Sequence, residues 1–330
     1  IGQAANGSQE KADKAFLARM MRHYSPVARH QAAEALGRLG ATDEILKALQ
    51  HSDPRVRRAG LDGITQYRTW SGGGKGCFPR EVVSKTFLPY ILEILNDQKS
   101  AFWEIDGALL ALGMCELEDV VAHLDLVRPY LDHPEWWLRQ HAAATIASLG
   151  EKEELLRPEL PRYMSALAKE IHIMPRRSMM GAMQALLTNE QVSKEFRNLL
   201  ARGLIQSMND TTVEPGRRAS IGMGFLYEVF RYTDLENNPE LGLQILKNYQ
   251  RGVPLEEMSS AWVFQGDVWG NPGLFRWAEI LSDRGDEKLA AEFTAEFKRQ
   301  IPRVKQQRAA TKDGRTIKAL DGLIEDLVRR

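Results

Sequence analysis

The stretch SPVARHQAAEALGRLG, residues Ser25–Gly40, carries the pattern that decides the fold of this chain. Its Ser-Pro pair predicts a turn, because proline suits the first position of a helix. Apolar residues follow at the spacing of one helix face: Ala32, Ala33, Leu36 and Leu39. Glycine is common just past a helix end, so Gly40 closes the unit. The pattern predicts a helix from about residue 27 to residue 39, with Leu36 buried.

The same unit returns at His133–Gly150, HPEWWLRQHAAATIASLG. There Arg139 takes the place of Arg29, and Leu149 is expected to be buried. A third copy starts at Asp53, a residue that caps helix N-termini well. Its helix is predicted over Arg55–Tyr67, with three residues facing inward: Val56, Ala59 and Ile64.

Each turn followed by arginine recurs at intervals of roughly 28 to 47 residues, which is the period of helical-hairpin repeats. One hairpin cannot bury its apolar face alone, whereas stacked hairpins bury a continuous core. The expected fold is therefore all-α, a right-handed α-solenoid of roughly six hairpins with a C-terminal helical cap. The predicted regions are a disordered segment 1–9, repeats over 10–233, and a C-terminal helical region 234–330.

Helical spacing predicts further helices between and after these units. Their expected ranges are Glu10–Met21, Asp43–Leu49, Glu81–Leu95, Ala101–Leu112, Leu117–Leu131, Glu159–Lys169, Phe196–Met208, Phe275–Leu281, Asp286–Ile301 and Arg303–Arg330. The glycine-rich segment Thr69–Pro79, TWSGGGKGCFP, is expected to be a loop. A phosphate-binding loop would need Ser or Thr after Lys75, and Gly76 stands there instead.

The residues around Asp53 resemble a known family. The run Asp53-Pro54-Arg55-Val56-Arg57, together with ALGRLG at Ala35–Gly40, is similar to HEAT repeats, in particular the short variety of phycobilisome-lyase-like proteins. The resemblance covers about residues 10–230. It implies that the turn Asp and the following Arg form a ladder between repeats, here Asp53, Arg57 and Arg139. HEAT repeats serve scaffolds, adaptors and a few enzymes, so the resemblance is specific for architecture only.

Composition narrows the function classes. The 330 residues include 44 Lys+Arg and 44 Asp+Glu, and this charge balance counts against a nucleic-acid binder. Two cysteines cannot form a disulfide framework or a four-thiolate zinc site. No apolar run is long enough to span a membrane. Because the chain starts at Ile1, we expect a processed form or a region of a larger protein, and the compartment stays open.

Charged and titratable residues give no catalytic pattern. The seven histidines lack the spacing of metal ligands and are expected to be structural or surface residues. Five carboxylates, expected to form a solvated acidic face, are Glu104, Asp106, Glu116, Glu118 and Asp119. A basic run between Lys298 and Lys318 is expected to be the wet side of an amphipathic helix. We expect no cofactor and no metal.

One stretch departs from the repeat pattern, SAWVFQGDVWGNPGLFRW at Ser260–Trp277. Its rings either plug the end of the solenoid or remain exposed as a binding platform. The candidate binding residues are Trp262, Phe264, Asp267, Trp269, Asn271 and Trp277. Trp269 is the choice for the exposed ring, since glycine, asparagine and proline follow it in a loop.

These observations favour a non-catalytic interaction scaffold that binds a protein or peptide. A carbohydrate partner stays open, since flat rings beside carboxylate and amide groups also suit sugars. The rival class is an enzyme or an enzyme's accessory region, either a HEAT-like nucleic-acid glycosylase or a glycan-acting protein. The glycosylase would need basic residues along its concave surface, and the acidic stretch between Glu93 and Glu135 counts against it.

Overall fold

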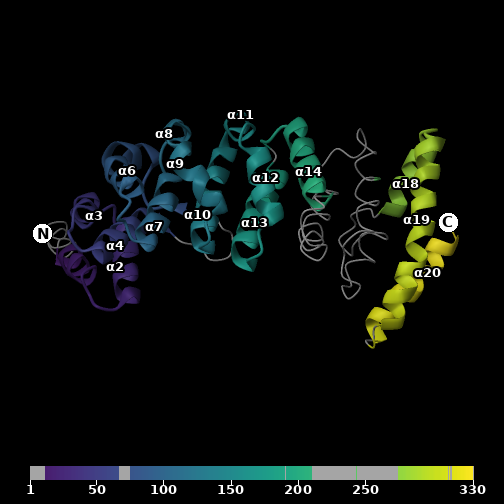
Figure 1. The fold of residues 1–330 in the computed structure, drawn as a ribbon, viewed down its shortest axis with the longest axis horizontal. Coiled ribbons are helices and arrows are strands. Elements are labelled where there is room, and N and C mark those ends of the chain that lie inside the picture. The colour runs from purple at the N-terminus through teal and green to yellow at the C-terminus, as the bar shows by residue number, and fades with distance from the viewer. Residues whose placement is uncertain are drawn as a thin grey trace, which may run out of the picture. The chain divides into compact units, whose positions relative to one another are not determined.

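The computed structural model describes residues 12–66, 75–189, 191–209, 243, 274–310, 312 and 314–329, and this part is mostly helical. The predicted all-α class is confirmed (Figure 1). Two compact units divide the chain. The first comprises Ile1–Glu159 and His172–Ala182, and the second comprises Leu160–Ile171 and Met183–Arg330. The predicted disordered segment 1–9 lies outside the described residues.

In the first unit, four helices form a row in which each packs against the next: α2 (Pro26–Arg38), α4 (Pro54–Ile64), α7 (Phe102–Leu112) and α10 (Trp136–Ala147). They run parallel, as contacts between like ends show: Arg57 meets Glu104 in the first turns of α4 and α7. Gly37 lies against Gly63 near the ends of α2 and α4, and Gly113 lies against Thr145 near the ends of α7 and α10. A second set packs beside this row, with α3 against α2 and α4, α6 against α7, and α9 against α10. Its members are α3 (Thr42–Leu49), α6 (Leu88–Asn96), α8 (Leu117–Ala122) and α9 (Leu124–Val127).

Shorter elements connect these helices. Residues 12–20 form a helix before α2. The others in the first unit are β1 (Thr65–Gln66), β2 (Lys75–Gly76), α5 (Arg80–Val82), the π-helix η1 (Val83–Phe87), the 3₁₀ helices η2 (Arg128–Asp132) and η3 (Ser148–Glu151), and α11 (Glu153–Leu156). α13 (Ile173–Thr188) belongs to both units.

The unit Ser25–Gly40 folds as its sequence predicts. Leu36 is fully buried, and so is Leu149 in the later copy, which confirms both predictions. Gly40 has φ +62°. Its N–H donates to Gly37 O and the Ala41 N–H donates to Leu36 O, the paired bonds of a Schellman motif. Leu39, expected on the same helix face as Leu36, is the C-cap of the helix and is 45% exposed.

The third unit starts as predicted, with Asp53 Oδ1 accepting from the Arg55 N–H at 2.9 Å and Pro54 at the first helical position. Its three inward residues are buried: Val56, Ala59 and Ile64. The helix ends at Ile64 rather than Tyr67, because Thr65–Gln66 becomes extended and pairs antiparallel with Lys75–Gly76. The end of the predicted glycine-rich loop therefore forms a strand, and residues 67–74 lie outside the described part.

The continuous helix predicted over Leu117–Leu131 is wrong, because the chain forms α8, α9 and η2 there. His123 causes the first break. Its Nδ1 lies 2.8 Å from the carbonyl oxygen of Asp119, which a continuous helix would bond to the His123 N–H. That N–H donates to Val120 O instead. Local competition by a side chain thus ends α8.

In the second unit, α12 (Leu160–Lys169) packs against α14 (Lys194–Asn209). A further set joins α19 to both α18 and α20: α18 (Leu274–Asp283), α19 (Glu287–Ala310) and α20 (Gly314–Arg329). The predicted helix end at Ile301 is wrong, since α19 continues through Pro302. Phe297 and Val304 are buried on either side of the proline, so packing outweighs the lost hydrogen bond. The described Lys residues of the basic run are exposed, as predicted.

Candidate binding edge of the first unit

A histidine starts the turn before three of the row helices. In each turn, the histidine Nδ1 accepts a hydrogen bond from the backbone N–H two residues later. The bonds are Ser25 N–H to His23 at 3.1 Å, Asp53 N–H to His51 at 3.0 Å and Glu135 N–H to His133 at 3.0 Å. His172 accepts from Met174 N–H in the same way at 3.4 Å, just as α13 begins. These side chains therefore shape the turns, as structural residues do.

An arginine six residues after each of the first three histidines closes the same turn. Its Nη1 donates to the carbonyl of that histidine and to the next carbonyl. The acceptors are His23 and Tyr24 for Arg29, His51 and Ser52 for Arg57, and His133 and Pro134 for Arg139, at 2.7–3.1 Å. Hydrogen bonds from a charged donor are stronger than neutral ones. Each turn is thus held from both ends.

Large rings stand exposed beside these turns. Tyr24 precedes α2 and is 86% exposed, Trp103 starts α7 at 41%, and Trp137 starts α10 at 43%. Trp137 stacks on Trp136 with ring centroids 4.1 Å apart, and Trp136 stacks on His172 at 4.2 Å. Because the row helices are parallel, their starts lie on one edge. We call this the aromatic edge, made of Tyr24, Phe102, Trp103, Trp136, Trp137 and His172.

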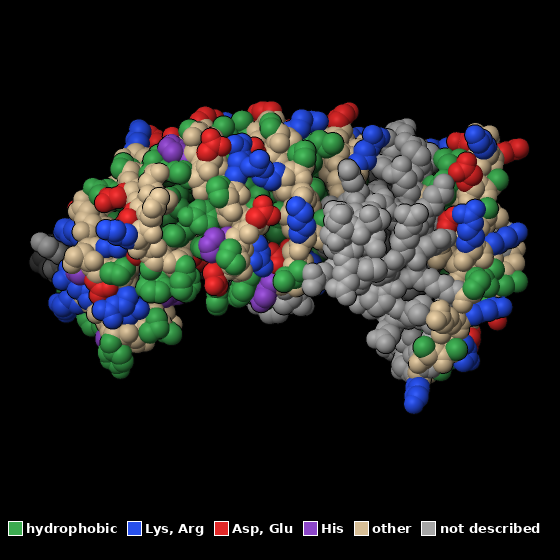
Figure 2. All heavy atoms as spheres, viewed as in Figure 1, with side chains coloured by type: hydrophobic (Ala, Val, Ile, Leu, Met, Phe, Trp, Pro, Cys, Tyr) green, Lys and Arg blue, Asp and Glu red, His purple; other side chains and the backbone are tan. Residues whose placement is uncertain are grey.

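Figure 2 shows hydrophobic side chains reaching the surface among charged ones over the first unit. Phe102 is 47% exposed and meets Trp103 edge to face, with centroids 5.1 Å apart. Glu135 Oε2 accepts from the Trp137 indole N–H at 3.4 Å. Each ring therefore has a neighbour that limits its motion while one side stays open to solvent.

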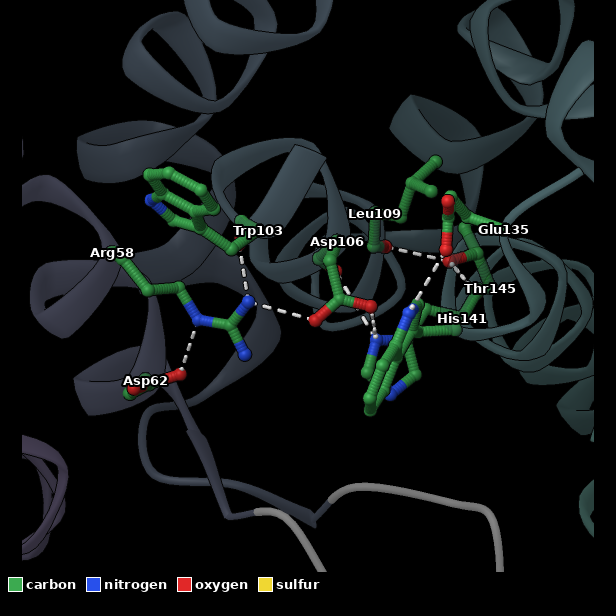
Figure 3. Close-up of polar contacts among 9 residues, drawn as sticks. Arg58, Asp62, Trp103, Asp106, Leu109, Glu135, His141 and Thr145 are labelled. Carbon is green, nitrogen blue, oxygen red and sulfur yellow. Dashed lines mark hydrogen bonds and ion pairs between the residues drawn. The ribbon is translucent and has the colours of Figure 1, made fainter. Parts of the chain in front are cut away.

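Behind the aromatic edge, polar side chains connect the row helices (Figure 3). Arg58 on α4 donates to Asp62 Oδ1 at 2.8 Å and to Asp106 Oδ2 on α7 at 2.7 Å. It also donates to the Trp103 carbonyl. Asp106 Oδ1 lies 2.6 Å from His141 Nδ1 on α10. On the other side, His30 on α2 lies 3.2 Å from Asp62. These contacts run across all four helices.

The basic groups in this series of polar contacts keep its two acids, Asp62 and Asp106, ionised. Burial would raise the pKa of Asp106, but the hydrogen bond from His141 and the charge of Arg58 outweigh it, so this pKa is lowered. The pKa of Asp62 is lowered for the same reason, with Arg58 and His30 opposing burial. The hydrogen bond to Asp62 raises the pKa of His30 above its ordinary value of 6.5. The buried charges therefore stabilise one another.

A second ion pair links α4 to α7. Arg57 Nε donates to Glu104 Oε1 at 2.8 Å, and Glu104 Oε2 accepts from the Ala101 N–H at 3.3 Å, which caps α7. Glu104 is 1% exposed and Asp106 is 8% exposed. The expected solvated acidic face is therefore wrong for these two residues, because arginines of the preceding helix hold them inside.

A cavity of about 380 Å³, lined by none of the residues of the aromatic edge, lies between the turn that precedes α4 and the end of α6. Its lining residues are Leu49, Gln50, His51, Ser52, Arg57, Tyr90, Glu93, Ile94, Asp97 and Ser100. Gln50 Nε2 donates to the Tyr90 hydroxyl at 2.6 Å across the cavity rim. Its lining mixes charged, polar and apolar side chains.

The candidate site predicted from sequence lies almost wholly outside the described residues: Trp262, Phe264, Asp267, Trp269 and Asn271. Trp277 lies in α18, and its side chain is also outside the described part. The residues implied by the HEAT resemblance can be placed. Asp53 binds Arg55 within its own turn, Arg57 reaches α7, and Arg139 closes the turn before α10.

The sequence predicted that the histidines are structural or surface residues, but it did not predict the hydrogen bonds that they make in the turns. A signal was present, because His23, His51 and His133 each stand six residues before an arginine. The repeat pattern also does not predict that the rings at the starts of α7 and α10 are exposed. An aromatic residue in the first turn of a helix, beside a rigid turn, is what could have pointed to them.

No protein-family model matches this chain, and no curated protein matches it. Within the described ranges, no group of three or more His, Cys, Asp or Glu residues is placed to hold a metal ion. Among the helices described, none has the length and apolar character needed to cross a membrane.

Proposed function

We infer that this chain is a non-catalytic interaction scaffold and that its aromatic edge docks a peptide segment of a protein partner. In this proposal the helix pairs are HEAT-like repeats of a right-handed solenoid, and the predicted C-terminal helical region, residues 234–330, is its cap. The observation that carries the proposal is the set of exposed rings at the starts of α2, α7 and α10, on one edge of parallel helices.

The rings have the chemistry of a binding surface. Trp and Tyr are enriched among the residues that dominate binding energy, because each buries much area with few rotatable bonds. Trp103 and Trp137 each expose more than a third of their surface to water. The parts of the two indoles that stay exposed gain nothing from folding, and a partner that covered them would bury that apolar surface.

The turns have the rigidity that such a surface needs. Arg29 and Arg139 each fix two backbone carbonyls next to the rings. The series of polar side-chain contacts that begins at His30 and ends at His141 holds the four helices together. A surface that is ordered before binding loses less conformational freedom when a partner arrives. A peptide lying along the edge would meet a prepared platform.

Selection from a phage-displayed library of random peptides tests this proposal. Wild-type protein should enrich peptides with a common motif, and a Trp103→Ala, Trp137→Ala double variant should bind them at least tenfold more weakly. Phe16→Ala is the matched control, because Phe16 is 52% exposed in the helix over residues 12–20, outside the aromatic edge. Equal binding by the double variant and the wild type would sink the proposal.

A further inference from the structure

We propose that the cavity between the turn before α4 and the end of α6 binds the cationic side chain, arginine or lysine, of a partner segment. This inference rests on the proposed function and adds the chemistry of the ligand. The cavity lies between the residues that lead into α4 and the last turn of α6. It adjoins the turn before α7, whose first residues are the exposed rings Phe102 and Trp103.

The uncompensated charges of the cavity are negative. Glu93 and Asp97 are both exposed and both line it. Within the described part of the chain, neither carboxylate forms an ion pair, defined as a basic group within 4.0 Å. Asp97 Oδ1 accepts the backbone N–H of Lys99 at 2.9 Å. A cation entering the cavity would meet two carboxylates that lack a counter-charge.

These two acids stand where a helix disfavours them. Glu93 lies in the last turn of α6 and Asp97 is its C-cap, at the negative end of the helix dipole. They are four residues apart on one face, a spacing at which like charges repel. The last turn of α6 carries no basic residue. The arrangement opposes the stability of α6, so a ligand cation that relieves it explains the two acids.

The arginine of the cavity does not make it an anion site. Arg57 is 26% exposed in its side chain and pairs with Glu104, whose carboxylate is 1% exposed. Its Nη1 is committed to the carbonyls of His51 and Ser52. The positive charge is therefore compensated inside the fold, and the net field in the cavity comes from Glu93 and Asp97.

Tyr90 adds a surface suited to a guanidinium or ammonium group. Its hydroxyl accepts from Gln50 Nε2 at 2.6 Å, which fixes the ring at the cavity wall. A cation over an aromatic face gains from the negative face of the ring, and the gain grows when water is excluded. Tyr90, Glu93 and Asp97 all belong to α6 or its C-cap, so the helix presents a held ring and two carboxylates to the cavity, the two features that recognise arginine and lysine side chains.

Titration with capped amino acids tests the inference directly. The probes are N-acetyl-arginine N-methylamide, its lysine analogue, and the neutral isostere N-acetyl-citrulline N-methylamide, followed by ¹H–¹⁵N NMR of the full chain. The arginine and lysine probes should give saturable shifts at the amides of Gln50 and Ser100, and the citrulline probe should bind at least tenfold more weakly. Equal binding of citrulline would overturn the inference.

A double variant separates charge from shape. Glu93→Gln with Asp97→Asn keeps the size of both side chains and should weaken binding of the arginine probe at least tenfold. It should fold at least as well as the wild type, because it removes two acids from a helix C-terminus. Glu154→Gln, an exposed acid in α11 outside the cavity, should bind as the wild type does. Unchanged binding by the double variant contradicts the inference.

The two proposals can fail separately. The Trp103→Ala, Trp137→Ala variant should still bind the arginine probe within about twofold, since neither ring lines the cavity. If library peptides bind through the rings while no cationic probe binds, the cavity inference is overturned and the proposed function stands. If the probes bind and no peptide depends on the rings, the cavity inference holds and the aromatic edge is not the docking surface.

Discussion

Arg57 on α4 and Glu104 on α7 meet at 2.8 Å, and this pair connects two helix starts of the aromatic edge. Glu104 is 1% exposed, so its charge has left water, whereas Arg57 keeps 26% of its side chain exposed. Breaking a buried pair costs more than forming it gains, because the remaining charge loses its partner. The pair therefore fixes how α4 and α7 lie against each other.

Glu104→Gln should lower the free energy of unfolding by about 1–3 kcal/mol, because a hydrogen bond to a charged group is replaced by a neutral one. Urea denaturation followed by circular dichroism measures the change. Glu81→Gln is the control, since Glu81 pairs with Lys85 on the surface of the same unit. The control should leave the midpoint nearly unchanged. Equal effects of the two substitutions would show that burial of Glu104 does not matter.

The contact between His30 and Asp62 predicts a pH dependence. The pKa of His30 is raised above 6.5 in the folded chain, so folding favours the protonated ring. This contribution is fully present below the unfolded pKa of 6.5 and is lost as pH rises through the folded pKa. The stability difference between wild type and His30→Asn should therefore shrink from about pH 5.5 to about pH 8.5.

Urea midpoints of both proteins across this range check the sign. Asp62 does not titrate in the window, because its own pKa is lowered from 3.8. A difference that stays constant or grows with pH would contradict the role given to His30. A direct NMR titration of the His30 ring should give a pKa above 6.5.

The repeat unit was predictable because its pattern is local. Helical spacing of apolar residues and a closing glycine are enough to place α2 and to bury Leu36. The polar contacts were not predictable in this way. Arg57 and Glu104 are 47 residues apart, and Arg58 and Asp106 are 48 apart. A single sequence shows five nearby acids, and only the packing of α4 on α7 shows which two are inside.

The candidate binding residues also divide into those that a local pattern indicates and those that only the packing of the helices shows. The sequence draws attention to Ser260–Trp277, where aromatic residues are dense and the repeat pattern stops. Trp103 and Trp137 are tryptophans like those of Ser260–Trp277, but they lie inside regular repeats, where a large ring is ordinarily expected to be buried. Their exposure follows from their place in the first turn of a helix whose other faces are covered. That geometry depends on how parallel helices line up, which local spacing does not encode.

Leu36 and Leu39 give a test within one unit. Leu36 is fully buried and Leu39 is 45% exposed. Leu36→Ala should cost about 2–5 kcal/mol, since it leaves a cavity between α2 and its neighbours. Leu39→Ala should cost less than about 0.5 kcal/mol, as surface substitutions usually do. Chemical denaturation of both variants measures the two changes in the free energy of unfolding. Similar changes would show that Leu39 is packed at the end of α2 as firmly as Leu36.

Gly37 lies against α4 so closely that a side chain has no room. A Cβ at this position would lie 2.0 Å from Gly63 O and 3.0 Å from Cys77 Cβ, and the carbonyl belongs to backbone that cannot turn aside. Two effects of Gly37→Ala oppose each other. Alanine favours a helix by about 1 kcal/mol over glycine, whereas overpacking typically costs about 1–3 kcal/mol. Because the added Cβ would lie only 2.0 Å from the carbonyl oxygen of Gly63, we expect an overpacking cost near the upper end of this range, about 3 kcal/mol.

We therefore expect Gly37→Ala to destabilise the chain by about 1–2 kcal/mol, the difference between the overpacking cost and the helix preference. Gly322→Ala in α20 is the matched control, because nothing lies within 4 Å of a Cβ there. The free energy of unfolding of the control should rise by up to about 1 kcal/mol, because alanine has the higher helix preference. The melting temperature and the urea midpoint should fall for Gly37→Ala and rise for Gly322→Ala. If Gly37→Ala stabilises as Gly322→Ala does, α2 and α4 do not touch at this glycine.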